Sequence, residues 1–266
     1  LLLSSYSYAT IYSKEEVIRV LQDASKPNSI SQMANSYPMF SGKKKQLLII
    51  HFQEIYKDDI FIMYMADQFV NAGLNDDQNP IYSNKSFATV AREYGATLAT
   101  SLLTKGLSRM NYEGQKYFIN YMKLMFSAAS DKQCASYLFP ERFRQTDAKE
   151  DQLNEMELLS KFSYEFIEQY LAFARKSMYA EVTESPLRRE PTKSEVDFAN
   201  NAFTLKFQEI YFKHPNNRAM DNYLENQTST DYRAACDFGL VSLRAMLELE
   251  GNMQDWYLQY FVNQMN

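Results

Sequence analysis

The chain has 266 residues, a formal net charge of −5 and 45% hydrophobic residues, which is typical of a folded chain with one large domain or two small ones. Its seven glycines and seven prolines are few for this length, which favours long helices and argues against a fold of many strands. The glycines never approach the spacing of phosphate-binding loops, and the acidic balance argues against nucleic-acid binding. We therefore expect no cofactor and no nucleic-acid partner.

The first nine residues look like the end of an apolar signal-peptide segment. Ser7-Tyr8-Ala9 fits the pattern of small residues at which signal peptidase cuts. We therefore expect residues 1–9 to be a signal-peptide remnant and the mature chain to be periplasmic or secreted. The alternative is the mildly apolar N-terminus of a cytoplasmic protein. No stretch is apolar for the about 18 residues of a membrane span, so the sequence predicts no transmembrane segment.

Helix signals follow one another along the chain, with breaks at proline, glycine and polar loops. Ser13-Lys14-Glu15-Glu16 is a capping box that opens the first helix. Residues 43–70 are strongly apolar and predict a buried helix, either kinked or straight. Gly73 marks the end of this segment. Further helices are expected near residues 30–34, 86–105, 111–125, 147–180, 192–212, 231–250 and 253–265. Because no segment alternates as strands do, the predicted fold class is all-α, a multi-helix bundle of about eight to ten helices.

Three short sequences recur in the same order and indicate an internal duplication. Residues 52–56 (FQEIY) recur at 207–211, Glu93-Tyr94-Gly95 corresponds to Asp237-Phe238-Gly239, and residues 117–122 match 260–265. We therefore expect two duplicated three-helix units joined by a long central helix at 147–180. The predicted organisation is 1–9 signal remnant, 10–42 N-terminal helices, 43–130 first unit, 131–191 connecting region with a proline-bounded linker, and 192–266 second unit.

The repeated positions carry two expectations about packing. Gly95 and Gly239 lie inside predicted helices, where glycine costs about 1 kcal/mol relative to alanine, so we expect a close helix approach at each. Glu54 and Glu209 are the charged residues of the repeated pentapeptide. We expect them on the solvated outer face rather than in a buried functional site.

No catalytic or metal-binding pattern stands out. His51 and Glu54 share a helix face, as a metal half-site requires, but Lys206 takes the histidine's place in the second copy. We therefore expect a partly buried, hydrogen-bonded His51. The segment around Ser108 lacks the closing glycine of a nucleophile elbow. Ser41-Gly42-Lys43-Lys44 fits the Ser-x-x-Lys pattern, but the motifs that accompany this pattern in enzymes are absent from the sequence. The sequence predicts no catalytic, cofactor-binding or metal-ligating residue.

Cys134 and Cys236 are the two cysteines of the chain. In an oxidising compartment they would form one disulfide that closes a loop of about 100 residues. In a reducing compartment they would be two small buried thiols in helix interfaces. The sequence leaves both alternatives open.

These observations favour a non-enzymatic exported helical binding protein that acts through a protein partner. The most specific version is a periplasmic immunity or inhibitor protein against a secreted toxin or hydrolase. The acidic balance favours a basic partner, and 20 tyrosines and 13 methionines supply contact surface. The alternatives are a small-molecule or lipid carrier with an apolar cavity between the repeat units, and an enzyme whose site is assembled from distant helices. No oligomeric state follows from the sequence.

Overall fold

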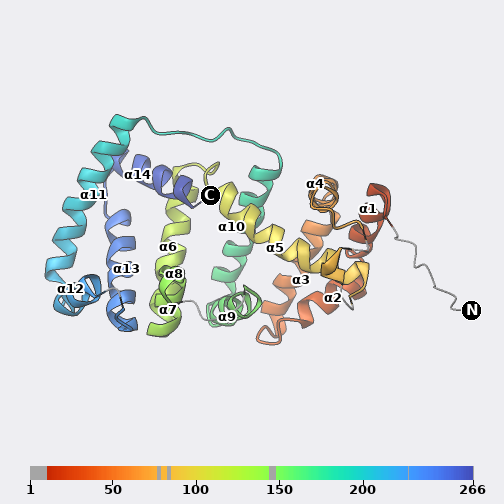
Figure 1. Cartoon of the computed structure of the whole chain (residues 1–266), viewed down its shortest axis with the longest axis horizontal. Helices are drawn as coiled ribbons and strands as arrows, with labels where there is room; N and C mark the ends of the chain where they lie inside the picture. The colour runs from red at the N-terminus through yellow and green to blue at the C-terminus, as the bar shows by residue number, and fades with distance from the viewer. Residues whose placement is uncertain (1–10, 77–78, 83–84, 144–147, 227, 266) are drawn as a thin grey trace, which may run out of the picture. The chain divides into compact units, whose positions relative to one another are not determined.

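The computed structural model describes residues 11–76, 79–82, 85–143, 148–226 and 228–265, so the predicted signal remnant at 1–9 lies outside the described residues. Within these ranges the chain forms fourteen α-helices and no strand, which confirms the all-α class (Figure 1). No helix of these ranges is long and apolar enough to cross a membrane.

The helices form two compact groups of chain segments. Unit 1 comprises the described residues up to Gly106 together with Leu171–Ser185, and unit 2 comprises Leu107–Tyr170 together with the described residues from Pro186 onward. The helices are α1 (Lys14–Asp23), α2 (Pro27–Asn35), α3 (Gly42–Lys57), α4 (Asp59–Asn71), α5 (Phe87–Leu107), α6 (Tyr112–Ala128), α7 (Asp131–Leu138), α8 (Pro140–Phe143), α9 (Ala148–Ser160), α10 (Tyr164–Val182), α11 (Lys193–Lys213), α12 (Asn217–Glu225), α13 (Tyr232–Leu247) and α14 (Gly251–Gln264).

The helix count exceeds the predicted eight to ten because long predicted helices are divided and short ones intervene. The helix expected at 43–70 is two helices, because Asp58 leaves the helical conformation and its carboxylate accepts from the Ile60 backbone N–H at 2.9 Å. The prediction of one long central helix at 147–180 is also wrong. This segment is α9 and α10, and Ser163 between them caps α10 by accepting from the Phe166 N–H at 3.2 Å.

The structure does not show the duplicated layout. Of the predicted first copy, α3 and nearly all of α5 belong to unit 1 and α6 belongs to unit 2, whereas α11, α13 and α14 all belong to unit 2. The pentapeptide matches are nevertheless alike in burial. Tyr56 and Tyr211 are 8% and 6% exposed, and the side chains of Glu54 and Glu209 are about half exposed, as expected for the outer face.

Glycine marks close helix contacts, but not at both expected positions. A Cβ at Gly239 of α13 would lie 2.4 Å from a Leu138 methyl of α7, so the close approach expected there is found. At Gly95 that expectation is wrong, because a Cβ would meet its nearest neighbour, the Tyr56 hydroxyl, at an ordinary 3.5 Å. The tightest contact is at Gly106, where a Cβ would lie 1.9 Å from the Ser177 carbonyl oxygen.

Buried glutamines connect helices of unit 2 at positions where no sequence pattern predicts a polar contact. Gln115 of α6 is fully buried and donates to the Gln259 side-chain oxygen of α14 at 2.9 Å. Gln259 in turn donates to the Ser108 carbonyl at 3.0 Å. The bond between the two amides satisfies the Gln115 nitrogen and holds α6 against α14, whereas the buried Gln115 side-chain oxygen has no hydrogen-bond partner among the described residues.

Candidate functional site

The predicted histidine position is part of an ion-pair cluster in unit 1. Arg175 of α10 donates to the His51 Nδ1 at 3.2 Å, and its Nε lies 2.6 Å from a Glu54 carboxylate oxygen. The Arg175 guanidinium therefore lies between His51 and Glu54, where a metal ion bound by these two side chains would lie. The described part of the chain holds no group of three or more His, Cys, Asp or Glu residues arranged for a metal.

This cluster gives the stability of the protein a specific pH dependence. Burial and the neighbouring Arg175 lower the pKa of His51 from 6.5 to about 3. Below pH 6.5 the unfolded chain binds a proton at His51 that the folded chain excludes, so stability falls as the pH drops towards 3, by about 1.4 kcal/mol per pH unit. We expect His51→Asn, whose amide oxygen also accepts from Arg175, to lose this slope.

Urea unfolding of both proteins at pH 7, 6, 5 and 4 measures the effect. The free energy of unfolding of the wild type minus that of His51→Asn should decrease steadily as the pH falls. Because every other titrating group is common to both proteins, parallel curves would show that His51 is protonated in the folded state as readily as in the unfolded one.

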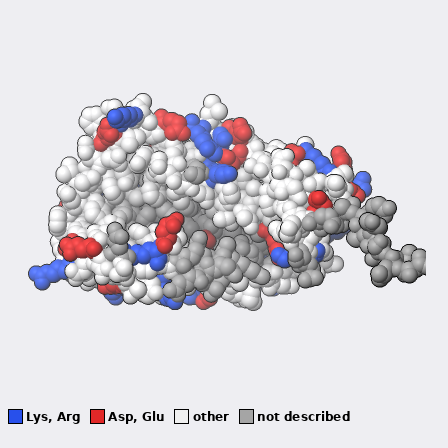
Figure 2. Space-filling view, viewed as in Figure 1, with Lys and Arg blue, Asp and Glu red and all other residues white. Residues whose placement is uncertain are grey.

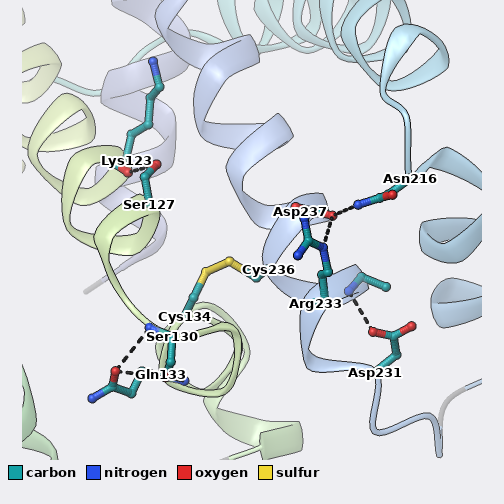
Figure 3. The surroundings of a disulfide bond; sticks show 11 residues. Lys123, Ser127, Ser130, Gln133, Cys134, Asn216, Asp231, Arg233, Cys236 and Asp237 are labelled. Carbon is teal, nitrogen blue, oxygen red and sulfur yellow. Dashed lines mark hydrogen bonds and ion pairs between the residues drawn. A yellow bond between two sulfur atoms is a disulfide. The ribbon is translucent and has the colours of Figure 1, made fainter.

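The two cysteines are joined in unit 2. The sulfurs of Cys134 in α7 and Cys236 in α13 are 2.00 Å apart, with the Cα atoms at 5.4 Å, and the bond spans 102 residues of sequence (Figure 3). The bond lies in the same α7–α13 contact as Gly239 and Leu138. Of the two alternatives that the sequence left open, the structure has the disulfide.

Ordinary structural hydrogen bonds surround the disulfide (Figure 3). Ser130 and Gln133 form a capping box that opens α7, and Asp231 caps α13 by accepting from the Ala234 N–H at 3.0 Å. The Asp237 carboxylate accepts from the Asn216 amide at 2.7 Å. Each of these polar groups satisfies a helix end or a loop, so the surroundings indicate a structural crosslink rather than a catalytic one.

A second cluster brings together three residues that no sequence pattern connected. The Tyr170 hydroxyl of α10 donates to the Glu155 carboxylate of α9 at 3.4 Å, and its ring stacks on Tyr121 of α6 with centroids 4.1 Å apart. Both tyrosines are buried, and burial raises the pKa of Glu155 and of both phenols. The phenols lie in a packed helix contact and only one carboxylate is present, so the cluster supports packing better than acid–base catalysis.

Unit 1 also contains a cavity of about 300 Å³. Its walls come from α1, α2, α3 and α5, with Leu21, Tyr56 and Ala91 among the apolar residues and Asp23 and Gln32 among the polar ones. This volume is at the lower end of the range for small-molecule sites. The carrier alternative expects a cavity between the repeat units, whereas this cavity lies within unit 1.

An exposed apolar surface lies on α4 and the end of α10, both in unit 1. Ile60, Met63 and Tyr179 are 44%, 53% and 41% exposed, and we call them the α4 patch. Glu181 and Glu184 lie near Tyr64 of the same helix α4, because burial and then these carboxylates, together with Tyr94, raise the pKa of the Tyr64 hydroxyl. Exposed apolar side chains on one part of a surface are typical of a protein-binding site.

Charge is otherwise spread thinly over the visible face of the molecule. Figure 2 shows lysine and arginine beside aspartate and glutamate in small groups, with uncharged surface between them. The described residues include exposed ion pairs four positions apart in sequence, such as Arg244 with Glu248 and Lys161 with Glu157. Exposed pairs of this kind add little stability. No extended basic area is present on this face, in keeping with the acidic composition.

Comparison with known proteins adds no relative. No protein-family model, no curated protein and no solved structure matches the chain.

Proposed function

We propose that this chain is an exported helical protein that acts by binding a basic protein partner through the α4 patch. The patch carries the proposal because it exposes Ile60, Met63 and Tyr179, and because two carboxylates lie near Tyr64 of α4. Apolar contact area supplies affinity, and these carboxylates attract a partner of opposite charge and exclude acidic ones. The net charge of −5 acts in the same direction over longer distances.

The disulfide supports the exported location. Disulfides persist in oxidising compartments such as the periplasm and the extracellular space, and are rare where thiols are kept reduced. The bond between Cys134 and Cys236 closes a long loop in unit 2 and so has a structural use in such a compartment. In the cytoplasm, where thiols are kept reduced, this disulfide would not be maintained.

In its most specific version, the partner is a secreted toxin or hydrolase that the chain inhibits. Inhibition by occlusion requires only a stable complementary surface, and no catalytic residues on the inhibitor. This version predicts that titration of the purified chain into the purified partner abolishes the partner's activity at a one-to-one ratio.

The test is quantitative capture from the periplasmic or secreted fraction of the native cells, with a salt gradient and mass spectrometry, followed by titration of the purified partner. Four baits are compared: wild type, Met63→Ser, Glu184→Lys, and Glu168→Lys as the matched control. Glu168 is exposed on the same helix α10 but belongs to unit 2, so its variant changes the net charge equally without touching the patch.

We expect a stoichiometric basic partner that salt releases. Wild type and Glu168→Lys should bind it equally, and Met63→Ser and Glu184→Lys should weaken binding at least tenfold. Capture that is equal for all four baits, or that survives high salt unchanged, would contradict the proposal.

A carrier function is the second candidate, on the strength of the cavity in unit 1. A bound small molecule would be retained in a mass measurement under native conditions and lost under denaturing conditions. A native mass equal to the denatured mass for protein purified from its own cells would argue against this alternative.

A further inference from the structure

The outer face of α11 in unit 2 carries an exposed apolar stripe. Phe198, Leu205 and Phe212 are 59%, 69% and 69% exposed. They are spaced seven residues apart, so they lie along one side of the helix. We call these three residues the α11 stripe. It runs along most of a 21-residue helix, which is roughly 30 Å long.

In the described part of unit 2, the α11 stripe takes little part in the packing, and Phe212 meets its chain neighbour Tyr211 edge to face. The core contacts of α11 come from its other side, where Phe203 stacks on Tyr257 of α14 and Phe207 meets Phe238 of α13 edge to face. In Figure 2 the surface over the middle of α11, at the left, is mostly uncharged. A helix that is apolar on two sides needs cover on both, and the contacts with α13 and α14 cover one of them.

The α11 stripe is self-complementary. Phenylalanine, leucine and phenylalanine at equal spacing read the same in both directions along the helix. When two such helices pair antiparallel about a two-fold axis near Leu205, leucine meets leucine at the centre and each Phe198 meets Phe212 of the second copy. Such self-complementarity is what a two-fold symmetric interface requires.

The flanking charges favour the same arrangement. On one side of the stripe, antiparallel pairing places Glu195 near Lys213 of the second copy. On the other side it places Asn201 near Gln208 of the second copy, so that two amides meet. Parallel pairing would instead place Asp197 near Glu195 of the second copy, which brings like charges together.

The available area is sufficient for a dimer of modest affinity. The three side chains expose on the order of 400 Å² per copy. Two copies would therefore bury on the order of 800 Å² from the stripe alone, and the flanking polar residues bring the total close to the roughly 1,200 Å² of a small stable interface.

We propose that the α11 stripe is the interface of an antiparallel, two-fold symmetric dimer of this chain. The dimer uses unit 2, whereas the proposed partner surface is the α4 patch of unit 1, so either proposal can fail without the other.

Sedimentation velocity over a range from about 1 to 200 µM tests for the dimer. We expect the wild type to shift with concentration from the 31.1 kDa monomer to a dimer. Leu205→Glu places two carboxylates at the centre of the interface and should remain monomeric throughout, a weakening of at least 50-fold. Leu187→Glu is the matched control, because Leu187 is 86% exposed and lies outside α11 in the same unit.

A monomeric wild type at the highest concentration would overturn the proposal. So would a dimer that Leu205→Glu leaves intact, with the circular dichroism and melting temperature of the variant showing that it is folded.

Crosslinking tests the orientation. In the antiparallel dimer two copies of residue 198 are about 20 Å apart along the axis, whereas residue 198 lies beside residue 212 of the second copy. A bis-maleimide with a reach of much less than about 20 Å should crosslink a mixture of the Phe198→Cys and Phe212→Cys proteins. It should crosslink neither variant alone. The native cysteines do not react, because they are disulfide-bonded. Crosslinking of each variant with itself would show a parallel arrangement and overturn the proposed one.

Discussion

Gly106→Ala should destabilise unit 1 by about 3 kcal/mol and lower the melting temperature by roughly 8 °C. The Cβ would lie 1.9 Å from the carbonyl oxygen of Ser177 and 2.6 Å from its carbonyl carbon. These are backbone atoms of α10, so no side-chain rotation relieves the clash. The two helix segments must move apart, which also lengthens the hydrogen bond from the Ser177 hydroxyl to the Leu103 carbonyl, now 2.9 Å.

Gly95→Ala is the matched control, since it is the same substitution in the same helix. At Gly95 a Cβ meets its nearest neighbour at 3.5 Å, so there is room for it. Replacing a helical glycine with alanine then stabilises by up to about 1 kcal/mol. Thermal unfolding followed by circular dichroism compares the two variants, and equal effects would show that α5 and α10 do not approach so closely at Gly106.

Removal of the disulfide should have an effect of similar size or larger in unit 2. A crosslink across about 100 residues restricts the unfolded chain by about 4 kcal/mol in the chain-entropy model. We expect Cys134→Ala with Cys236→Ala to lower the melting temperature by roughly 10 °C. The two sulfurs connect α7 to α13, so loss of the bond acts on the contact that Leu138 and Gly239 also form.

A reducing agent provides the control. It should lower the melting temperature of the wild type to that of the double variant, and leave the double variant unchanged. Alkylation of the protein taken directly from its native cells adds a test of location. In an oxidising compartment the two cysteines should be disulfide-bonded and therefore should not be alkylated. Two alkylated cysteines and a wild type insensitive to the reducing agent would contradict both the bond and the exported location.

Local features of the structure followed from the sequence because their causes are local. The capping boxes at Ser13 and Thr192 open α1 and α11, since each depends on residues only three positions apart. The equivalent signal at Ser130 and Gln133, which opens α7, was present in the sequence but was missed. The scarcity of glycine and proline and the absence of strand alternation were enough to determine the all-α class.

Other features depended on contacts between distant segments. Sequence pattern assigned His51 a hydrogen bond, but its partner Arg175 is 124 positions away and belongs to another helix. The recurring pentapeptides are alike in burial, yet α3 and nearly all of α5 belong to unit 1 and α6 belongs to unit 2.

The sequence by itself determined the helical class, most helix starts, the two cysteines available for a crosslink and the acidic balance. The tertiary structure decided where helices end, that the two cysteines are bonded, which glycine lies against a neighbouring backbone, and which apolar side chains remain exposed. Helix periodicity marks an apolar face but does not say whether another helix covers it. Phe203 and Phe198 of α11 are both apolar in sequence, yet one packs on α14 and the other is exposed. Only the packing of the whole chain separates a core residue from an interface residue, because burial is a property of the neighbours and not of the side chain alone.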